Sequence, residues 1–382
     1  MSTLKYTCLL LFMPFLGFSQ ETINGTITHN GVQRSYILYL PAGYDGMTPM
    51  PLVLNFHGYG SNASEQMWYG DFRSIADTAG FLIVHPLGSL FNGITHWNVG
   101  GFTLGSTADD LGFTALLLDS LVANYAINAD RIYATGMSNG GYMSFLLGCQ
   151  LSDRIAALAS VTGSMTPQIT STCNPERPVP VMQIHGTNDG VVPYSGASWT
   201  NAIPSVIQFW VDNNTCDPLP TVVTLPDVVT TDGSTVEHSV YSGGDKGAVV
   251  EHFKVINGGH TWPGSVFSSN GTNQDINASK EIWRFFSQYD LNGLINTSSV
   301  DDNSDLHRKL EVFPNPTQSV LYLNLADQPL SQLYQIYDLR GQFVASGGIQ
   351  AKDHIDLSNF APGVYLLKIG AQSTFIIRSE KY

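Results

Sequence analysis

The sequence predicts two folded domains, an α/β domain with a mostly parallel sheet and a small C-terminal all-β sandwich. From residue 30 to 290, short apolar runs alternate with segments of helical period, a pattern typical of α/β folds. The stretch INTSSVDDNSD is polar and lacks periodicity, and the segments beyond it alternate apolar and polar residues. We expect a signal peptide at 1–19, the α/β domain at 20–292, a linker at 293–308 and the sandwich at 309–382.

The first twenty residues, MSTLKYTCLLLFMPFLGFSQ, have the features of a secretory signal peptide. They carry one lysine, an apolar run from Cys8 to Phe18, and a small residue, Ser19, at the expected cleavage point. The run is too short to cross a bilayer, and no later stretch reaches membrane-spanning length. We therefore expect a secreted, extracellular protein without a membrane span.

Charge and cysteine content exclude some partners and predict one disulfide. The chain has 17 basic and 31 acidic residues, a net charge of −14, and no lysine or arginine cluster. Nucleic acids and anionic membrane surfaces are therefore poor partners. Cys8 lies in the signal peptide, which leaves Cys149, Cys173 and Cys216. An odd number in an oxidising compartment predicts one disulfide and one spare thiol.

Five apolar runs are candidates for buried strands of the first domain. They are PLVLNF at 51–56, FLIVH at 81–85, RIYAT at 131–135, VPVMQIH at 179–185 and HFKVI at 252–256. The segment RSYILYLP, which precedes them, predicts an antiparallel edge strand. Apolar residues at helical spacing predict helices around Tyr142–Cys149 and Ile282–Tyr289, with a shorter one at Val206–Trp210.

The last part of the chain predicts a β-sandwich with an addressing role. Its candidate strands are LEVFPNP, VLYLNLA, LYQIYDLRGQFVAS, HIDLSNFAPGVYLLKI and STFIIRS, and it has no cysteine and no cluster of titratable groups. The motifs VFPNP, IYDLRGQ and FAPGVYLLKI, with Lys381 near the terminus, resemble the C-terminal sorting domain of type IX secretion cargo in Bacteroidetes. The resemblance implies the type IX machinery as a partner and export through the outer membrane.

Residues 136–140, Gly-Met-Ser-Asn-Gly, fit the G-x-S-x-G pattern of a nucleophile elbow. They follow the predicted strand RIYAT and precede the predicted helix that contains Tyr142. The glycines leave room for a serine on a strained turn, and the helix start favours negative charge that develops during acyl transfer. Ser138 is therefore the candidate nucleophile.

Two further residues complete a Ser-Asp-His set in the chain order of α/β-hydrolases. Asp189 lies in HGTNDGVVPY after one predicted strand, and His260 lies in NGGHTWPG after another. Both loops are at carboxyl ends of strands, where ligands of open α/β sheets bind. Because a serine hydroxyl needs a general base and the base needs an orienting acid, we expect His260 to be the base and Asp189 the orienting group.

Other histidines near strand ends leave a metal-hydrolase alternative open. It would use His57, His85 and His185 with a carboxylate from Asp109 or Asp110. None of these histidines has HxH or HExxH spacing, so we predict no metal and no cofactor. Histidines 57 and 185 are instead expected to orient loops, and the two aspartates to cap the helix LGFTALLLDSLVANY.

An oxyanion hole needs two backbone N–H donors. One is expected from Asn139, the residue after the nucleophile, and the other from the loop FHGYGSNAS at 56–64. Tyr59 is the expected donor of this loop, with its ring beside the acyl group. Gly58 and Gly60 are the alternatives.

Several segments together resemble the secreted esterases of the polyhydroxybutyrate depolymerase and feruloyl esterase family. They include LVLNFHGYGSNAS, THWNVGG, GMSNGGYMSFLLGCQ, RPVPVMQIHGTNDGVVPYSG and INGGHTWPG, and the resemblance spans about residues 30–290. It implies an α/β-hydrolase fold with little or no lid and the catalytic roles given above. It also implies a disulfide between Cys149 and Cys173 and a free Cys216, because SVYSGGDKG lacks the usual partner cysteine.

We expect a serine carboxylic ester hydrolase that acts through an acyl-enzyme. Aromatic residues near the site and the lack of a cationic clamp suit neutral apolar or aromatic groups. Tyr59, Trp97 and Trp262 are candidate substrate contacts, with Tyr59 and Trp262 on either side of a flat ring. Polyesters are the preferred substrates, either polyhydroxyalkanoate or an aromatic polyester such as polyethylene terephthalate. Feruloyl or acetyl esters of plant polysaccharide are the close alternative, and a non-catalytic surface-binding protein is a distant one.

Overall fold

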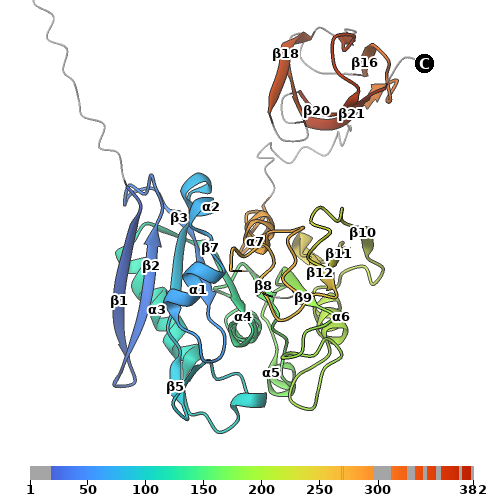
Figure 1. Cartoon of the computed structure of the whole chain (residues 1–382). Coiled ribbons are helices and arrows are strands. Elements are labelled where there is room, and N and C mark those ends of the chain that lie inside the picture. Colours follow the sequence, from blue (N-terminus) through green and yellow to red (C-terminus); the bar gives the residue numbers. More distant parts are fainter. Residues whose placement is uncertain are drawn as a thin grey trace, which may run out of the picture. The chain divides into compact units, whose positions relative to one another are not determined.

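The computed structural model describes residues 19–267, 269, 271–295, 311–324, 332–338, 342–349, 354–369 and 372–379. The chain divides between Ile295 and Asn296 into two compact units (Figure 1). In the part of the chain that the structure describes, no helix is long and apolar enough to cross a membrane. The signal peptide predicted at 1–19 up to residue 18, the linker predicted at 293–308 from residue 296 onward, and Lys381 lie outside the described residues.

A ten-stranded sheet forms the centre of the first unit, and its middle strands are parallel. The parallel strands lie in the order β4 (Leu82–Pro86), β3 (Met50–Phe56), β7 (Ile127–Met137), β8 (Ala157–Val161), β9 (Val181–Gly186) and β12 (Val250–Ile256). Antiparallel strands flank them, β2 (Val32–Leu40) and β1 (Glu21–His29) beside β4, and β11 (Thr235–Tyr241) and β10 (Thr221–Thr224) beside β12. The predicted α/β class with a mostly parallel sheet is confirmed.

One predicted strand position is wrong, and one central strand of the sheet is not predicted. The segment RSYILYLP forms most of β2, which pairs with β4 on one side and β1 on the other, so it is not an edge strand. The sequence of β8, ALASV, was not among the predicted strands. Alanine and serine give little strand signal, and this segment is a strand because all of its residues are buried in the middle of the sheet.

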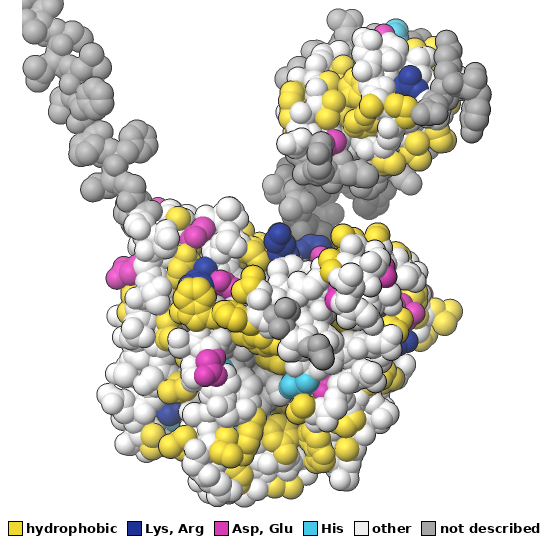
Figure 2. Space-filling model, in the orientation of Figure 1, with side chains coloured by type: hydrophobic (Ala, Val, Ile, Leu, Met, Phe, Trp, Pro, Cys, Tyr) yellow, Lys and Arg dark blue, Asp and Glu magenta, His cyan; other side chains and the backbone are white. Residues whose placement is uncertain are grey.

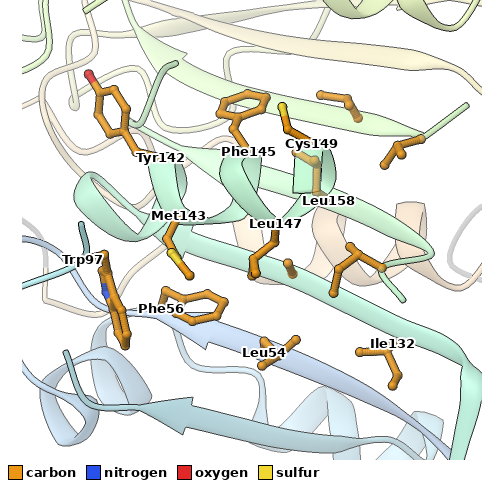
Figure 3. Close-up of a cluster of buried hydrophobic side chains, with 14 of the residues drawn as sticks. Leu54, Phe56, Trp97, Ile132, Tyr142, Met143, Phe145, Leu147, Cys149 and Leu158 are labelled. Atoms are coloured by element: carbon orange, nitrogen blue, oxygen red, sulfur yellow. The ribbon is translucent and has the colours of Figure 1, made fainter. Parts of the chain in front are cut away.

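Helices cover both faces of the sheet and enclose two hydrophobic cores. They are α1 (Ala63–Tyr69), α2 (Arg73–Ala79), α3 (Asp110–Asn124), α4 (Asn139–Gln150), α5 (Pro167–Thr172), α6 (Ile203–Asn213) and α7 (Ala278–Phe286). Successive residues of β3 point into opposite cores. Leu52 and Leu54 belong to the core that contains residues of α3, α4 and α6, whereas Val53 belongs to the core that contains residues of α2 and α7. Figure 3 shows part of the first core, in which side chains of α4 lie over β3 and β7.

Short elements join these layers. They are the hairpin strands β5 (Ser89–Phe91) and β6 (Ile94–His96), β13 (Tyr289–Asp290) and β14 (Gly293–Leu294), and the turns η1 (Gly101–Thr103) and η2 (Asp245–Gly247). Asp109 caps α3 as predicted, because its carboxylate accepts the Gly112 N–H over 2.9 Å. Asp110, which was also predicted to cap α3, is instead its first residue, and its buried carboxylate pairs with Arg34 at 2.7 Å.

Covalent and ionic links tie helices to the sheet. Cys149 at the end of α4 is joined by a disulfide to Cys173 after α5, and Cys216 is a buried free thiol. Both observations agree with what the family resemblance implied. Glu251 on β12 accepts hydrogen bonds from Arg284 of α7. Burial opposes ionisation of Glu251, but hydrogen bonds from a histidine of β11 and from this arginine outweigh burial, so its pKa lies below its ordinary value.

In the described residues of the second unit, the strands form two small antiparallel sheets. One contains β15 (Glu311–Phe313), β16 (Val320–Asn324) and β19 (His354–Asp356), and the other contains β18 (Phe343–Ile349), β17 (Gln332–Asp338), β20 (Gly363–Ile369) and β21 (Gln372–Arg378). Residues of both sheets, among them Leu321, Ile336 and Leu367, form one apolar core. The predicted all-β class of this part is confirmed.

Candidate active site

Ser138 lies between β7 and α4 in a strained backbone conformation. Its φ of 53° and ψ of −120° are unusual for a residue with a side chain. The glycines around it are required by close approach of β3. A Cβ on Gly136 would lie 2.5 Å, and one on Gly140 2.1 Å, from the carbonyl oxygen of Phe56. The two glycines of the G-x-S-x-G pattern are therefore needed because the turn packs tightly against the neighbouring strand.

Asp189 and His260 lie after β9 and β12, which are adjacent in the sheet. Their side chains meet, with His260 Nδ1 donating to Asp189 Oδ2 over 2.8 Å. The other oxygen, Oδ1, accepts the N–H groups of Val191 and Val192, each over 2.8 Å. The carboxylate is thus held from both sides, and it fixes the orientation of the imidazole ring.

The charge of Asp189 is stabilised although its side chain is fully buried. Burial opposes ionisation of the carboxyl, but the hydrogen bond and charge of His260 and the N–H of Val192 outweigh this effect. The pKa of Asp189 therefore lies below its ordinary value, and the group remains a carboxylate at neutral pH.

Ser138 and His260 border one cavity of about 630 Å³. The other lining residues come from the loop after β3, from α1, from the end of β7 and from the loop after His260: Gly58, Tyr59, Ser61, Ser64, Glu65, Gln66, Trp68, Tyr69, Met137 and Phe267. The structure thus brings the three predicted triad residues to one place, with Asp189 buried behind His260.

Asn139 and Tyr59 each have an N–H group beside the cavity with no acceptor among the described residues. Asn139 is the first residue of α4, so its N–H has no acceptor within the helix. The N–H of Tyr59 is likewise unpaired in the described part of the chain, whereas the N–H of Gly60 donates to Thr95 O over 2.8 Å. Gly60 is thereby removed from the alternatives. Gly58 remains one, because its N–H also has no acceptor in the described part of the chain.

The structure corrects the predicted substrate contacts of two tryptophans. Trp97 is 0% and Trp262 1% exposed, and neither lines the cavity. Trp262 packs against Phe72, and its indole donates to Ser279 of α7 over 3.2 Å. The predicted sandwich of a flat ring between Tyr59 and Trp262 is therefore wrong. Large aromatic side chains near a motif predict binding groups, but these two are buried in the core.

Tyr59 does line the cavity, and further aromatic residues join it. Trp68 and Phe267 are 50% and 56% exposed at the cavity, and Tyr59 is 39% exposed. Phe267 and Glu65 were not predicted as site residues. Glu65 and Trp68 are three positions apart on α1, and this helical spacing indicates that one face of the helix lies on the cavity.

His57 and His185, two of the three histidines of the metal alternative, each hydrogen-bond to a loop carbonyl. His57 Nδ1 donates to Gly58 O over 2.7 Å, and burial lowers its pKa to about 4. His185 Nε2 donates to Val192 O over 2.9 Å, as expected for a residue that orients a loop. Burial lowers the pKa of His85 to about 3. Among the described residues, no group of three histidine, cysteine or carboxylate side chains is placed to hold a metal ion.

Both units match known protein families. Residues 34–204 match the family described as esterase PHB depolymerase, and residues 311–379 match the secretion system C-terminal sorting domain. The matches confirm the two resemblances noted in the sequence. The sorting domain indicates type IX export and an extracellular or cell-surface location.

Curated proteins similar to this chain are esterases. The bifunctional acetylxylan esterase/xylanase XynS20E of Neocallimastix patriciarum is 27% identical over 73% of this chain and 36% of its own length. Feruloyl esterase B of Piromyces equi is 33% identical over 43% of this chain and 30% of its own length. The chain thus spans about a third of the length of these two relatives.

A solved structure supports the fold of the first unit. The acetyl xylan esterase from Aspergillus awamori superposes with a TM-score of 0.50 at 14% identity, covering 70% of this chain and 99% of that chain. At this level of identity the similarity extends to the fold alone.

Proposed function

We propose that this chain, in which residues 34–204 match the esterase PHB depolymerase family and residues 311–379 match a secretion sorting domain, is a secreted serine carboxylic ester hydrolase. The observation that carries the proposal is the shared cavity of Ser138 and His260, with Asp189 hydrogen-bonded behind the imidazole. A strained nucleophile turn, a base and an orienting carboxylate are the parts that acyl transfer requires.

The proposed reaction has two halves. His260 Nε2 accepts the proton of Ser138 as the serine oxygen bonds to the ester carbonyl carbon, and the resulting oxyanion accepts the N–H groups of Tyr59 and Asn139. The bond to the alcohol then breaks, and the alcohol leaves with the proton from His260. Water attacks the acyl-enzyme in the same way, with His260 again as base, and releases the carboxylic acid and the free serine.

The proposed substrates are polyesters, either polyhydroxyalkanoate or an aromatic polyester such as polyethylene terephthalate. Tyr59, Trp68 and Phe267 present exposed rings at the cavity, and Val266, which precedes Phe267 in the chain, is also exposed. Figure 2 shows hydrophobic side chains around the hollow in which a histidine is visible. An open, apolar rim suits a long chain of uncharged units, because such a chain extends beyond the reacting ester on both sides.

A second candidate is the feruloyl or acetyl ester of a plant polysaccharide. The names of the relatives from Piromyces equi and Neocallimastix patriciarum favour it. Ser61, Glu65 and Gln66 also place polar groups on one wall of the cavity, where sugar hydroxyls could bind. Both candidates use the same acyl-enzyme chemistry, so a comparison of substrates distinguishes them.

Labelling tests the chemistry. A fluorophosphonate should label the wild-type protein at Ser138, and Ser138→Ala should lose both labelling and hydrolysis of a p-nitrophenyl ester. Ser205→Ala, which changes an exposed serine on α6, should keep both. Labelling or hydrolysis that survives in Ser138→Ala would refute the nucleophile. An unlabelled wild-type protein would favour the non-catalytic binding alternative.

Product release tests the substrate. The purified protein is given polyhydroxybutyrate film, polyethylene terephthalate film, feruloylated arabinoxylan and acetylated xylan, and soluble acids are measured. Release from a film that is lost in Phe267→Ala, with p-nitrophenyl ester hydrolysis retained, supports the polyester proposal. Release from the polysaccharides alone would replace it by the second candidate.

A further inference from the structure

The two proposed oxyanion donors come from different parts of the chain. Tyr59 lies in the loop after β3, whereas Asn139 begins α4. Their N–H groups can serve one oxyanion only if the loop and the helix keep a fixed separation. Trp97, directly after β6, belongs to neither segment and is hydrogen-bonded to both.

On the helix side, the amide of Asn139 exchanges two hydrogen bonds with the backbone of Trp97. The Trp97 N–H donates to Asn139 Oδ1 over 2.7 Å, and Asn139 Nδ2 donates to the Trp97 carbonyl over 3.0 Å. Both residues are fully buried, so water does not compete for these bonds. The paired bonds fix both the distance and the orientation of the first residue of α4.

On the loop side, the indole of Trp97 holds His57, two residues before Tyr59. Its Nε1–H donates to the His57 carbonyl over 2.9 Å. The indole ring also packs at 5.0 Å from the rings of Phe56 and His57, and Figure 3 shows it beside Phe56. The His57 ring is itself fixed, because its Nε2 accepts the N–H of Gly88 over 2.9 Å.

We propose that Trp97 is a positioning residue that sets the separation of the two oxyanion donors. The inference rests on the proposed function, because it concerns the same oxyanion. A misplacement of about 1 Å can lower a rate about a hundredfold. Since the bound ester carries no oxyanion and the negative charge develops only as the reaction proceeds, loosening the donors lowers kcat and leaves KM nearly unchanged.

The test is Trp97→Phe, which keeps an aromatic ring and removes the indole N–H. We expect kcat for a p-nitrophenyl ester to fall about ten- to a hundredfold, with KM within about twofold of wild type. The matched control is Trp210→Phe on α6. Trp210 is also fully buried, but its indole N–H has no partner among the described residues. The control should change Tm about as much as Trp97→Phe does, but it should keep the wild-type kcat and KM.

A second variant covers the case in which Trp97→Phe does not fold. Asn139→Ala keeps the backbone N–H of that position but removes the amide that binds Trp97. It should show the same selective loss in kcat. Where both variants fold, the double variant should lose less than the product of the two single losses, because both release the same link.

Fluorophosphonate labelling separates failure of this inference from failure of the proposed function. An unlabelled Ser138 in the wild-type protein would overturn both. A labelled wild-type protein in which Trp97→Phe and Asn139→Ala keep the kcat of the Trp210→Phe control would overturn the positioning role alone. A loss confined to KM, or one shared by the control, would also overturn it.

Discussion

Replacing Asp189 by asparagine tests whether His260 needs a carboxylate behind it. Two N–H donors, from Val191 and Val192, face the Oδ1 position, and His260 Nδ1 faces Oδ2. The new side chain has one oxygen and one NH2 group. Its oxygen must take the Oδ1 position, because an NH2 group there would face two donors. The NH2 group is then left facing His260.

This geometry determines the size of the effect. The NH2 group donates to Nδ1 and leaves the imidazole proton on Nε2, where the ring cannot accept the proton of Ser138. The equivalent change in a serine protease triad lowers kcat about 10⁴-fold, because the tautomer is wrong. We expect a similar loss for Asp189→Asn, which corresponds to about 5 kcal/mol in the activation barrier.

Steady-state hydrolysis of a p-nitrophenyl ester at neutral pH measures the effect, with circular dichroism to verify the fold. Asp77→Asn is the matched control, because Asp77 also accepts a backbone N–H and a side-chain donor but lies outside the cavity. The control should keep its kcat. If Asp189→Asn retained more than about a tenth of the wild-type kcat, the orienting role would be refuted.

Three further predictions concern the fold around the site. Gly140→Ala should lower both Tm and kcat, because the added Cβ would lie 2.1 Å from a backbone oxygen of β3. Gly190→Ala is the control and should leave Tm unchanged, because a Cβ at that position would have no atom within 4 Å. The Cys149–Cys173 disulfide spans 24 residues, and its removal should lower the free energy of unfolding by about 3 kcal/mol. Chemical denaturation measures this change, and an equal stability after reduction would contradict the prediction. Glu251→Gln should be less stable than wild type at pH values above 4.5, the ordinary pKa of the carboxyl. Because the pKa of Glu251 is lowered in the folded protein, this difference in stability should vanish as the pH falls through the folded value. A difference that persists in acid would contradict the pairing with Arg284.

The nucleophile turn could be predicted because the residues that define it are close together in the sequence. Gly136, Ser138 and Gly140 are adjacent in sequence, and the strand before them and the helix after them have strong patterns. The loops of Asp189 and His260 could be placed for the same reason, since each directly follows an apolar run that forms a strand. The carboxyl ends of parallel strands necessarily meet at one edge of the sheet.

The roles of the tryptophans could not be predicted, because they depend on distant segments. Trp97 is buried because it packs against Phe56 of β3 and hydrogen-bonds to Asn139 of α4. These partners lie about forty positions before it and about forty positions after it in the chain. Nothing in the neighbouring sequence distinguishes it from Trp68, which is half exposed. The small-residue strand β8 was missed for a similar reason, because its partners on both sides make it a strand.

The order of the strands has a consequence for folding kinetics. The elbow forms from contiguous residues, but His260 follows Ser138 by 122 positions and follows Asp189 by 71. His260 reaches the site only after β12 has paired with β9, and contacts of such long range form slowly. A chain whose sheet is still incomplete therefore has a nucleophile without its base. In a refolding experiment, the return of hydrolysis will mark the docking of this strand and will lag behind the recovery of helical signal.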